Sequence, residues 1–592
     1  MKKLFIYIAL SFSLSIFAQI DQLAQNYFDR SDFEKALISY EDLLKSQPYN
    51  NLFFQRKIEC YQQLSQFDKA DKSLNEQLKR TNQPHLLVEL GYNFQLQKDT
   101  VKARNYYEQS LKKVKQQPSN VYTVAATFER HSLLQYALKS YRIASETDSK
   151  LNFNYQTAIL NGQLGNFELM IDQLLTESQN NAGYYIMIQN QLSRFLTEDT
   201  NGSFAASLKK ALLLRAQKTQ DVFWNRYLSW FFVQQKEYGK AFVQEKAIYK
   251  RETESLSTIM NLAELTMDEK ETETAKEILT FVLENTQDFA LKIKSHSYLL
   301  NMKIEIASEQ EYESIRLELE GMMKQFGVSP YTLQLQILQA HFLAFNIKNP
   351  EAGKNVLKSA LNLPLNQFQK ADVKMELADI LLYEEKFNQA LIYYSQIEED
   401  LKNNDVGHQA SLKAAKTSYF KGDFEWALKQ FKELKAASTQ LIANDALELF
   451  LIINDNTVAD STHVALKKFA RGDYLLYQNK TQGALLQFLA ILKEDKGNEI
   501  EAITRCRLGE IYEKQNDFAS ALSQYQYIID NFSDGIYADE ALYFSAEIYN
   551  KQLKDVEKAK ALYEKIIFNH QDSIYFVDAR IKFRQLRGDT NL

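Results

Sequence analysis

The sequence is poor in glycine, proline, cysteine and tryptophan. Among its 592 residues are 17 glycines and 6 prolines, well below the roughly 7% and 5% of an average protein. These residues make most tight turns, so their scarcity excludes a fold of many short strands. Hydrophobic residues make up 45% of the sequence, which excludes a disordered chain. The composition therefore predicts a long all-α protein.

Only two cysteines occur, Cys60 and Cys506, and 446 positions separate them. A disulfide would need their Cα atoms within about 7 Å of each other, and an elongated fold would keep them apart. We therefore expect two small, buried core residues, with pairing between two molecules as the alternative.

Long blocks of one charge sign are also missing. The net charge of the sequence is −6, and it becomes −8 once Lys2 and Lys3 are removed. No run of lysine and arginine stands out, so the sequence gives no support to a nucleic-acid surface. Stretches of mixed charge, such as residues 308–320, are expected to be solvated helix faces.

The first residues have the pattern of a secretory signal peptide. Lys2 and Lys3 precede an apolar run of 15 residues that ends at Ala18, whereas a membrane-spanning helix needs about 20. We expect residues 1–18 to be removed on export, and no other segment reaches a spanning length. The leader is similar to those of Bacteroidota periplasmic proteins, which implies a periplasmic location. No cysteine follows the apolar run, so any association with the outer membrane would be peripheral.

A repeat of about 34 residues runs along the chain. Its clearest early copies centre on small residues with steps of 34, 33 and 34, namely Ala36, Ala70, Ala103 and Ala137. Less regular copies follow at Met170, Ala206, Ala241, Ala275, Ile315 and Gly353. The pattern then sharpens at Ala390, Ala427, Ala484, Ala521 and Ala559.

Two further positions recur with these small residues. Four residues later stands an aromatic: Tyr40, Tyr107, Tyr141, Tyr394, Phe431, Phe488, Tyr525 and Tyr563. Twelve residues earlier stands a second small residue: Ala24, Gly91, Ala125, Ala378, Gly472 and Gly509. A spacing of four places the first small residue and the aromatic on one helical face. Prolines close the first three units, where a helix must stop: Pro48, Pro84 and Pro118.

These positions resemble the tetratricopeptide repeat (TPR), a helix–turn–helix of 34 residues, over nearly all of the chain that follows the leader. The resemblance implies an α-solenoid, a right-handed superhelix of helical hairpins whose first helices line a concave groove. A lone hairpin cannot bury its apolar face, so neighbours stack into a continuous core. The small residues would let paired helices approach closely, and the aromatic would fill the groove of the next hairpin. Glu510 and Glu513 would face outward, toward the concave groove.

The step of 57 residues between Ala427 and Ala484 leaves room for one extra helix, predicted at residues 441–453. A polar loop at 454–462 would follow it and mark a boundary. The repeat thus divides the mature chain into an N-terminal array, degenerate middle repeats, C-terminal units with the extra helix, and terminal units with a capping helix, at residues 19–220, 221–365, 366–453 and 454–592.

The C-terminal units are similar to those of outer-membrane assembly lipoproteins and of the periplasmic Tol-Pal coordinator. The resemblance places Ser533-Asp534 and Asp572-Ser573 at helix N-caps, where a side-chain oxygen accepts from free backbone amides.

The last segment, residues 575–589, is predicted to be a closing helix. It is the most basic amphipathic end of the chain and carries Lys582, Arg584 and Arg587. We expect either a solubilising cap of the repeat array or a surface on which a partner docks.

One aromatic cluster stands apart, at residues 222–235. In the repeat register it is the first helix of the Ala241 unit, and it includes Trp224, Arg226, Tyr227 and Trp230. It is interpreted either as thick core packing or as a partner-binding patch, since tryptophan, tyrosine and arginine dominate interface energetics. In the second interpretation Arg226 and Trp230 face the groove.

No enzyme motif is found in the sequence. It has neither a phosphate-binding glycine loop, nor a paired-histidine zinc helix, nor a nucleophile elbow, and its seven histidines occur singly. We predict that the protein is not an enzyme and has no cofactor, metal or small-molecule substrate.

Three Asp-Ser/Thr triplets, which begin at Asp99, Asp460 and Asp572, are similar to the short O-glycosylation signal of Bacteroidota periplasmic proteins. Helix capping accounts equally well for the first and the third.

The repeat and the leader together favour a non-catalytic periplasmic scaffold. Such a protein would bind protein or peptide partners in a cell-envelope assembly, without nucleic acid and without a transmembrane segment. Two alternatives stay open: a holdase-like peptide binder for exported clients, and a structural accessory of a secretion or peptidoglycan machine.

Overall fold

The computed structural model describes residues 21–219, 221–252, 256–437, 439–457, 463–494 and 500–589. Within these ranges every regular element is a helix and none is a strand, which confirms the predicted all-α fold. The predicted signal peptide lies outside the described residues. The chain divides into two compact units, residues 1–236 and 237–592, which we call unit 1 and unit 2.

Unit 1 begins with a helical stretch at residues 21–29. Its further helices are α2 (Phe33–Ser46), α3 (Asn51–Gln63), α4 (Phe67–Thr81), α5 (His85–Leu96), α6 (Thr100–Gln116), α7 (Val121–Arg130), α8 (Leu134–Thr147), α9 (Asn154–Gln163), α10 (Phe167–Asn180), α11 (Tyr185–Glu198), α12 (Ser203–Thr219) and α13 (Val222–Gln234). Two short 3₁₀ helices join them, η1 (Pro118–Asn120) and η2 (Ala182–Tyr184).

Unit 2 contains α14 (Tyr238–Glu252), α15 (Ser257–Asp268), α16 (Thr272–Asn285), α17 (Phe289–Ile306), η3 (Glu309–Glu311), α18 (Tyr312–Phe326), η4 (Pro330–Thr332), α19 (Leu333–His341), η5 (Phe342–Asn346), α20 (Pro350–Ala360), α21 (Gln367–Tyr383) and α22 (Phe387–Asp400). It continues with α23 (Asp405–Lys421), α24 (Phe424–Ala437), α25 (Gln440–Thr457), α26 (Val464–Tyr477), α27 (Thr481–Glu494), α28 (Ile500–Lys514), α29 (Phe518–Asn531), α30 (Ala538–Glu547), η6 (Ile548–Gln552), α31 (Val556–Asn569) and α32 (Phe576–Arg587).

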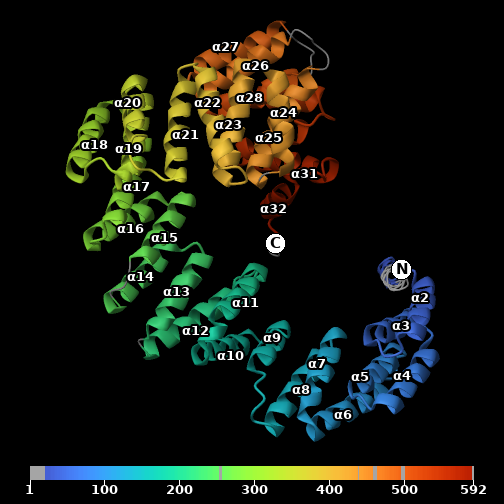
Figure 1. Cartoon of the computed structure of the whole chain (residues 1–592). Coiled ribbons are helices and arrows are strands. Elements are labelled where there is room, and N and C mark those ends of the chain that lie inside the picture. Colours follow the sequence, from blue (N-terminus) through green and yellow to red (C-terminus); the bar gives the residue numbers. More distant parts are fainter. Residues whose placement is uncertain are drawn as a thin grey trace, which may run out of the picture. The chain divides into compact units, whose positions relative to one another are not determined.

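Within each unit most consecutive helices pack in pairs, as α5 does with α6 and α28 with α29 (Figure 1). The helices stop where the early prolines predicted. Pro48 follows α2, Pro84 directly precedes α5, and Pro118 opens η1 after α6. Each pair leaves an apolar face that only the next pair covers, so the described helices form an α-solenoid of TPR-like hairpins.

The two helices of a hairpin meet at the predicted small residues. A Cβ atom added to Gly91 would lie 2.3 Å from the Tyr107 ring, and one added to Gly509 would lie 2.4 Å from the Tyr525 ring. Both rings are buried. Glycine is therefore required at these positions, because the aromatic ring of the second helix occupies the space that any side chain would fill.

The aromatic position corrects one expectation. The sequence predicts that the ring fills the groove of the next hairpin. In the structure one side of the ring packs on the small residue of its own hairpin. Its far side then reaches the following unit, where the Tyr107 and Phe128 ring centroids lie 5.5 Å apart and those of Tyr525 and Phe544 lie 6.0 Å apart. One ring therefore joins the helices within a hairpin and the hairpins to each other.

The register predicted at Ala206 is wrong. Ala206 is exposed, whereas Phe204, Leu208 and Leu212 of the same helix are buried. Helix α12 packs mainly against α10 and α13 rather than closely against α11. Large side chains can therefore face the core there, and no small residue is needed.

Left-handed backbone occurs at the hairpin turns although glycine is scarce. Lys98, Glu385 and Asn516 follow first helices with φ values of 65°, 61° and 60°, a conformation that costs a residue with a Cβ about 1 kcal/mol or more. The Asp517 N–H then donates to the Tyr512 carbonyl at 2.9 Å. The Tyr512 carbonyl lies in the last turn of the helix and also accepts from the Gln515 amide at 3.1 Å.

The predicted extra helix is present as α25, which packs against α24. Residues 454–457, expected to open a polar loop, instead form its last turn, and residues 458–462 lie outside the described residues.

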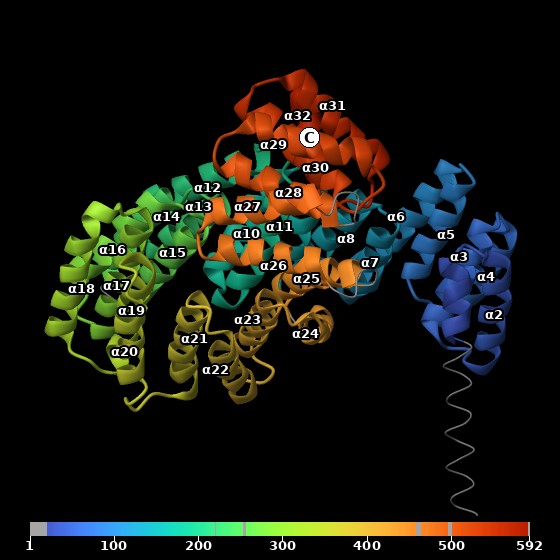
Figure 2. The ribbon, with the colours of Figure 1, turned by 90° about the horizontal axis from the view of Figure 1, so that it is seen from above.

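Unit 2 brings helices together that are far apart in sequence (Figure 2). The Tyr474 hydroxyl of α26 donates to the Leu382 carbonyl at 2.7 Å, and the Gln478 side chain donates to the Tyr383 carbonyl at 2.7 Å. Both carbonyls belong to the last turn of α21, and the Leu382 carbonyl also accepts from the Glu385 amide at 3.0 Å. The bonds from Tyr474 and Gln478 hold α26 beside α21 and α23.

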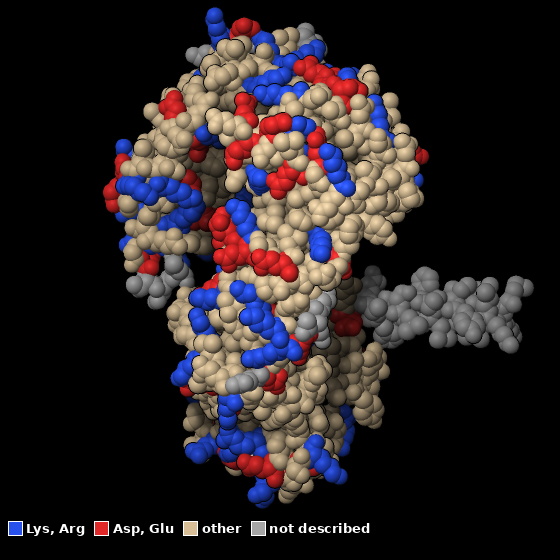
Figure 3. Space-filling view, turned by 90° about the vertical axis from the view of Figure 1, so that its left-hand side faces the viewer, with Lys and Arg blue, Asp and Glu red and all other residues tan. Residues whose placement is uncertain are grey.

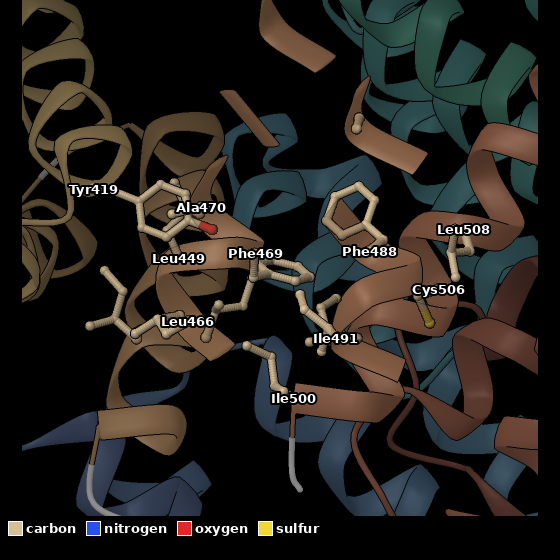
Figure 4. Close-up of a cluster of buried hydrophobic side chains, with 14 of the residues drawn as sticks. Tyr419, Leu449, Leu466, Phe469, Ala470, Phe488, Ile491, Ile500, Cys506 and Leu508 are labelled. Atoms are coloured by element: carbon tan, nitrogen blue, oxygen red, sulfur yellow. The ribbon is translucent and has the colours of Figure 1, made fainter. Parts of the chain in front are cut away.

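The core of unit 2 continues through several hairpins without interruption. Figure 4 shows part of it, with Tyr419, Phe469, Phe488 and Cys506 on one connected cluster of buried side chains. Cys506 and Cys60 are both buried free thiols, as expected for small core residues. Burial raises the pKa of the Cys60 thiol to about 12.

The predicted side-chain caps are absent at both C-terminal helices. Helix α30 begins at Ala538 after Tyr537, and neither Ser533 nor Asp534 caps it, because turns of the backbone use the amides before it. At α32 the N-cap is Tyr575, and Ser573 Oγ accepts from the Tyr575 amide at 3.1 Å rather than from an amide of the helix.

Replacement of Gly509 by alanine tests the close helix contact. We expect Gly509→Ala to lower the free energy of unfolding by about 1–3 kcal/mol, because the added methyl group overlaps the Tyr525 ring. Gly321→Ala in α18 is the matched control, since nothing lies within 4 Å of a Cβ there. It should be neutral or should stabilise by up to about 1 kcal/mol. Urea unfolding followed by far-UV circular dichroism gives both values, and equal midpoints for the two variants would contradict the contact.

Candidate functional site

A cavity of about 780 Å³ lies within unit 2. Its walls come from α19, η5, α21, α23, α25, α26 and α28. Most of these are first helices of their hairpins, and α25 is the extra helix. The extra helix α25 therefore contributes Asp445, Glu448 and Leu449 to the lining.

Part of the wall is apolar and aromatic. Leu412 and Phe420 of α23 face it together with Leu476 and Tyr477 of α26. The Phe420 and Tyr477 ring centroids lie 5.9 Å apart, and Tyr477 is 39% exposed. This wall offers accessible rings to an apolar group.

One arginine stands among three carboxylates at the α25–α28 end of the cavity. Arg507 contacts Glu448 at 2.5 Å, Glu510 at 2.9 Å and Asp473 at 3.5 Å. The Tyr419 hydroxyl donates to the other Asp473 oxygen at 2.9 Å. Because Arg507 is only 20% exposed, these charges interact in a medium less polar than water.

Asp473 is the most perturbed acid of this end. Burial is the main cause that raises its pKa, Arg507 and the Tyr419 hydrogen bond oppose this, Glu448 and Glu510 add to it, and the net value is about 6. Because Arg507 is shared with two other carboxylates, it opposes the rise in the pKa of Asp473 less than a cation of its own would.

Separate ion pairs line the rest of the cavity. Lys413 and the Tyr394 hydroxyl each contact Asp379 at 2.5 Å, and Lys416 contacts Asp445 at 2.9 Å.

His341 lies on a further wall of the cavity, and its Nδ1 is 2.9 Å from Glu376 Oε1. Burial lowers the pKa of His341, but the hydrogen bond and the charge of Glu376 outweigh it, and the net shift is upward.

Four charged residues of the cavity lining occupy the same position in their first helices. Each comes one residue after the small residue of a first helix: Asp379 after Ala378, Lys416 after Ala415, Asp473 after Gly472 and Glu510 after Gly509. The sequence pattern predicts three of these four small residues, Ala378, Gly472 and Gly509, but it does not mark the charged residues that follow them. Alignment of the first helices at that position could have found the charged lining.

Glu510 lies on the groove as expected, but Glu513 does not. Glu513 accepts a hydrogen bond from the Tyr525 hydroxyl at 2.7 Å. Burial raises the pKa of this carboxyl. It therefore belongs to the contact between α28 and α29.

The aromatic cluster of α13 is split between core and surface. Trp224 and Tyr227 are 1% and 0% exposed, and the Tyr227 hydroxyl lies 2.6 Å from Ser178 Oγ. Arg226 is exposed and Trp230 is half-buried. The four side chains thus do not form one patch, and a partner at this helix would meet Arg226 and Trp230 only.

Lys582 serves the packing of the closing helix. Its Nζ contacts the Tyr543 hydroxyl and Glu547, each at 2.7 Å, and Asp578 at 2.6 Å. These bonds fasten α32 to α30, so the side chain is not available as a docking group.

The other two basic residues of α32 differ from Lys582. Arg587 is exposed and pairs with Asp589 at 2.5 Å, while Arg584 is half-buried. Their role in partner binding stays a prediction.

Other expectations concern chemistry at the surface. Figure 3 shows lysines and arginines mixed with aspartates and glutamates on one face, as expected for solvated helices.

Among the described residues no three histidine, cysteine or acidic side chains are grouped to hold a metal ion. In the same part of the chain no helix has the length and apolar character needed to cross a membrane. Asp99 of the first triplet caps α6 by accepting from the Lys102 amide at 3.0 Å.

Comparison with known proteins adds little to this description. No protein-family model and no curated protein matches the chain. A solved structure of Naa15/Naa10 bound to HypK-THB is 11% identical, with 97% of this chain and 96% of that chain covered and a TM-score of 0.30. The APC/C hetero-tetramer Cut9-Hcn1 is 13% identical, with 92% and 98% covered and a TM-score of 0.23. Scores this low carry no argument, so the TPR-like solenoid rests on the helices of this chain.

The raised pKa of Asp473 predicts a pH-dependent effect of Asp473→Asn. The unfolded chain loses this proton near pH 4, whereas the folded chain keeps it up to about pH 6. Ionisation of Asp473 therefore destabilises the fold as the pH rises through this window. Asparagine cannot ionise, so the stability of the variant relative to wild type should rise by on the order of 2 kcal/mol between pH 4 and pH 6.5.

Urea midpoints measured across this pH range test the expectation. Asp445→Asn is the control, because that carboxylate is exposed and has its own lysine. A constant difference between Asp473→Asn and wild type would show that Asp473 ionises normally in the folded protein.

Loss of Lys582 should loosen the closing helix. In Lys582→Met two carboxylates keep their charge without the shared cation, and we expect faster amide hydrogen exchange over residues 576–587. Lys551→Met is the control, since Lys551 also contacts Glu547 but is 60% exposed, and such pairs contribute little. Unchanged exchange in Lys582→Met would mean that apolar packing alone holds α32.

Proposed function

We propose that this chain is a non-catalytic scaffold that binds segments of partner proteins in the cavity of unit 2. The observation that carries the proposal is the lining itself, which combines accessible aromatic rings with charged side chains from several first helices. Four first helices of unit 2 each present one charged residue at the same register, so these stacked hairpins form a continuous recognition surface. A surface built in this way suits an elongated ligand.

The state of the charged groups supports binding rather than catalysis. Asp379, Asp445 and Glu448 each contact a lysine or arginine. A general base must instead be free to take a proton from a substrate. The prediction that the protein is not an enzyme and needs no cofactor is kept as part of the proposal.

We further propose that the scaffold works in the periplasm, within a cell-envelope assembly. Support for this location comes from the basic, apolar leader at residues 1–18 and from the resemblance of the C-terminal repeats to envelope-assembly proteins. The partners would be exported proteins, and contact with the outer membrane would be peripheral.

Site-specific crosslinking in intact cells tests the function. Gln409 of α23 is exposed and lines the cavity, so a photo-reactive amino acid placed there should capture partners. Gln389 of α22 is the matched control, because it is also an exposed glutamine but does not line the cavity. We expect a small, reproducible set of envelope proteins at position 409 and not at 389, identified by mass spectrometry.

Two outcomes would contradict the proposal. Equal products at the two positions would show that the cavity is not the binding surface. A broad range of unfolded exported chains at position 409 would favour the holdase-like alternative. Fractionation of the same cells tests the periplasmic location separately.

A further inference from the structure

The cavity of unit 2 has more negative than positive charge. Five carboxylates line it, those of Asp379, Asp445, Glu448, Asp473 and Glu510. Only three cations, the side chains of Lys413, Lys416 and Arg507, share the same lining. With His341 neutral, the cavity has a formal excess of two negative charges.

This excess is concentrated around Arg507. Asp379 and Asp445 each have a lysine of their own, whereas Arg507 serves Asp473, Glu448 and Glu510 together. The α25–α28 end therefore has two negative charges more than its own cation balances. A second cation would be attracted to this end, and more strongly than in water, because the walls exclude part of the solvent.

The aromatic wall continues from this charged end. Tyr419 donates to Asp473, and Phe420 and Tyr477 follow along the lining. Arginine and lysine side chains pack their apolar stems against such rings while the charged head reaches a carboxylate. The volume of about 780 Å³ suits a short run of side chains and not a folded domain.

We infer that the cavity receives an apolar segment of a partner protein that carries an arginine or lysine, with the cation among the carboxylates around Arg507 and its apolar neighbours against Leu476 and Tyr477. This inference rests on the proposed function and adds the chemistry of the partner. The bound cation lies beside Glu448 and Glu510, the two carboxylates that α25 and α28 contribute to this end.

Selection from a library of random displayed peptides tests this chemistry. Peptides are first selected for binding to the full-length protein. Those that also bind a double variant, Glu448→Gln with Glu510→Gln, are then removed, because their binding does not depend on the charged end. Both substitutions keep the size of the side chain, and Glu425→Gln is the matched control, because Glu425 of α24 is exposed and does not line the cavity. We expect the peptides that depend on these two residues to contain an arginine or lysine next to aromatic or aliphatic residues.

A thermodynamic cycle then distinguishes direct contact from an indirect effect on the fold. A selected peptide is compared with the same peptide in which citrulline replaces arginine, or norleucine replaces lysine. The neutral peptide should bind the wild-type protein and the Glu425→Gln variant about tenfold or more weakly. The double variant should bind both peptides with similar affinity.

Three results would overturn the inference. The first is that peptides whose binding depends on the two glutamates carry no cation. The second is that the double variant loses affinity for the charged and the neutral peptide equally. The third is that the selection yields no peptide whose binding depends on the charged end. The proposed function is judged separately. Crosslinks at position 409 would support it even if the selected peptides were neutral or acidic, and their absence would refute it whatever the peptides contain.

Discussion

The structure depends on the contact between a small residue of one helix and an aromatic ring of the next. Gly91 with Tyr107 and Gly509 with Tyr525 leave no room for a Cβ, so the distance between the paired helices is fixed at its minimum. The same ring reaches the following hairpin. The spacing within a hairpin and the spacing between hairpins are therefore set by one side chain, and the adjacent face of the first helix is left to form the groove.

Much of the fold follows from this contact and could be predicted. The small and aromatic positions recur at fixed spacing because each hairpin solves the same packing problem, and the prolines mark where its helices stop. Ala206 shows where this reasoning fails. Helix α12 packs on α10 and α13, so large side chains replace the small one and the periodic signal no longer marks the buried face.

The candidate site was harder to predict because its residues come from many helices. Asp473 and Arg507 are 34 positions apart, and no local motif joins them. Lys582 and the tryptophans are predicted as binding residues from their residue type, since basic and aromatic residues often mark interfaces. Composition does not show that Lys582 has three partners inside the fold or that Trp224 is covered. Only the register of each first helix, read together with the stacking of several hairpins, reveals the lining.

That register has an evolutionary consequence. The residue that builds the architecture and the residue that faces the groove are neighbours in sequence, as Gly509 and Glu510 are, yet about 100° apart around the helix. At Glu510, which is partly exposed, a substitution would change the charge of the groove and leave the contact between Gly509 and Tyr525 in place. A deletion of one residue before this pair would rotate both residues about the helix axis, so that the packing contact and the groove-facing charge would be lost together. The charge of the groove can therefore change by substitution alone, whereas insertions and deletions within a helix would disrupt the packing.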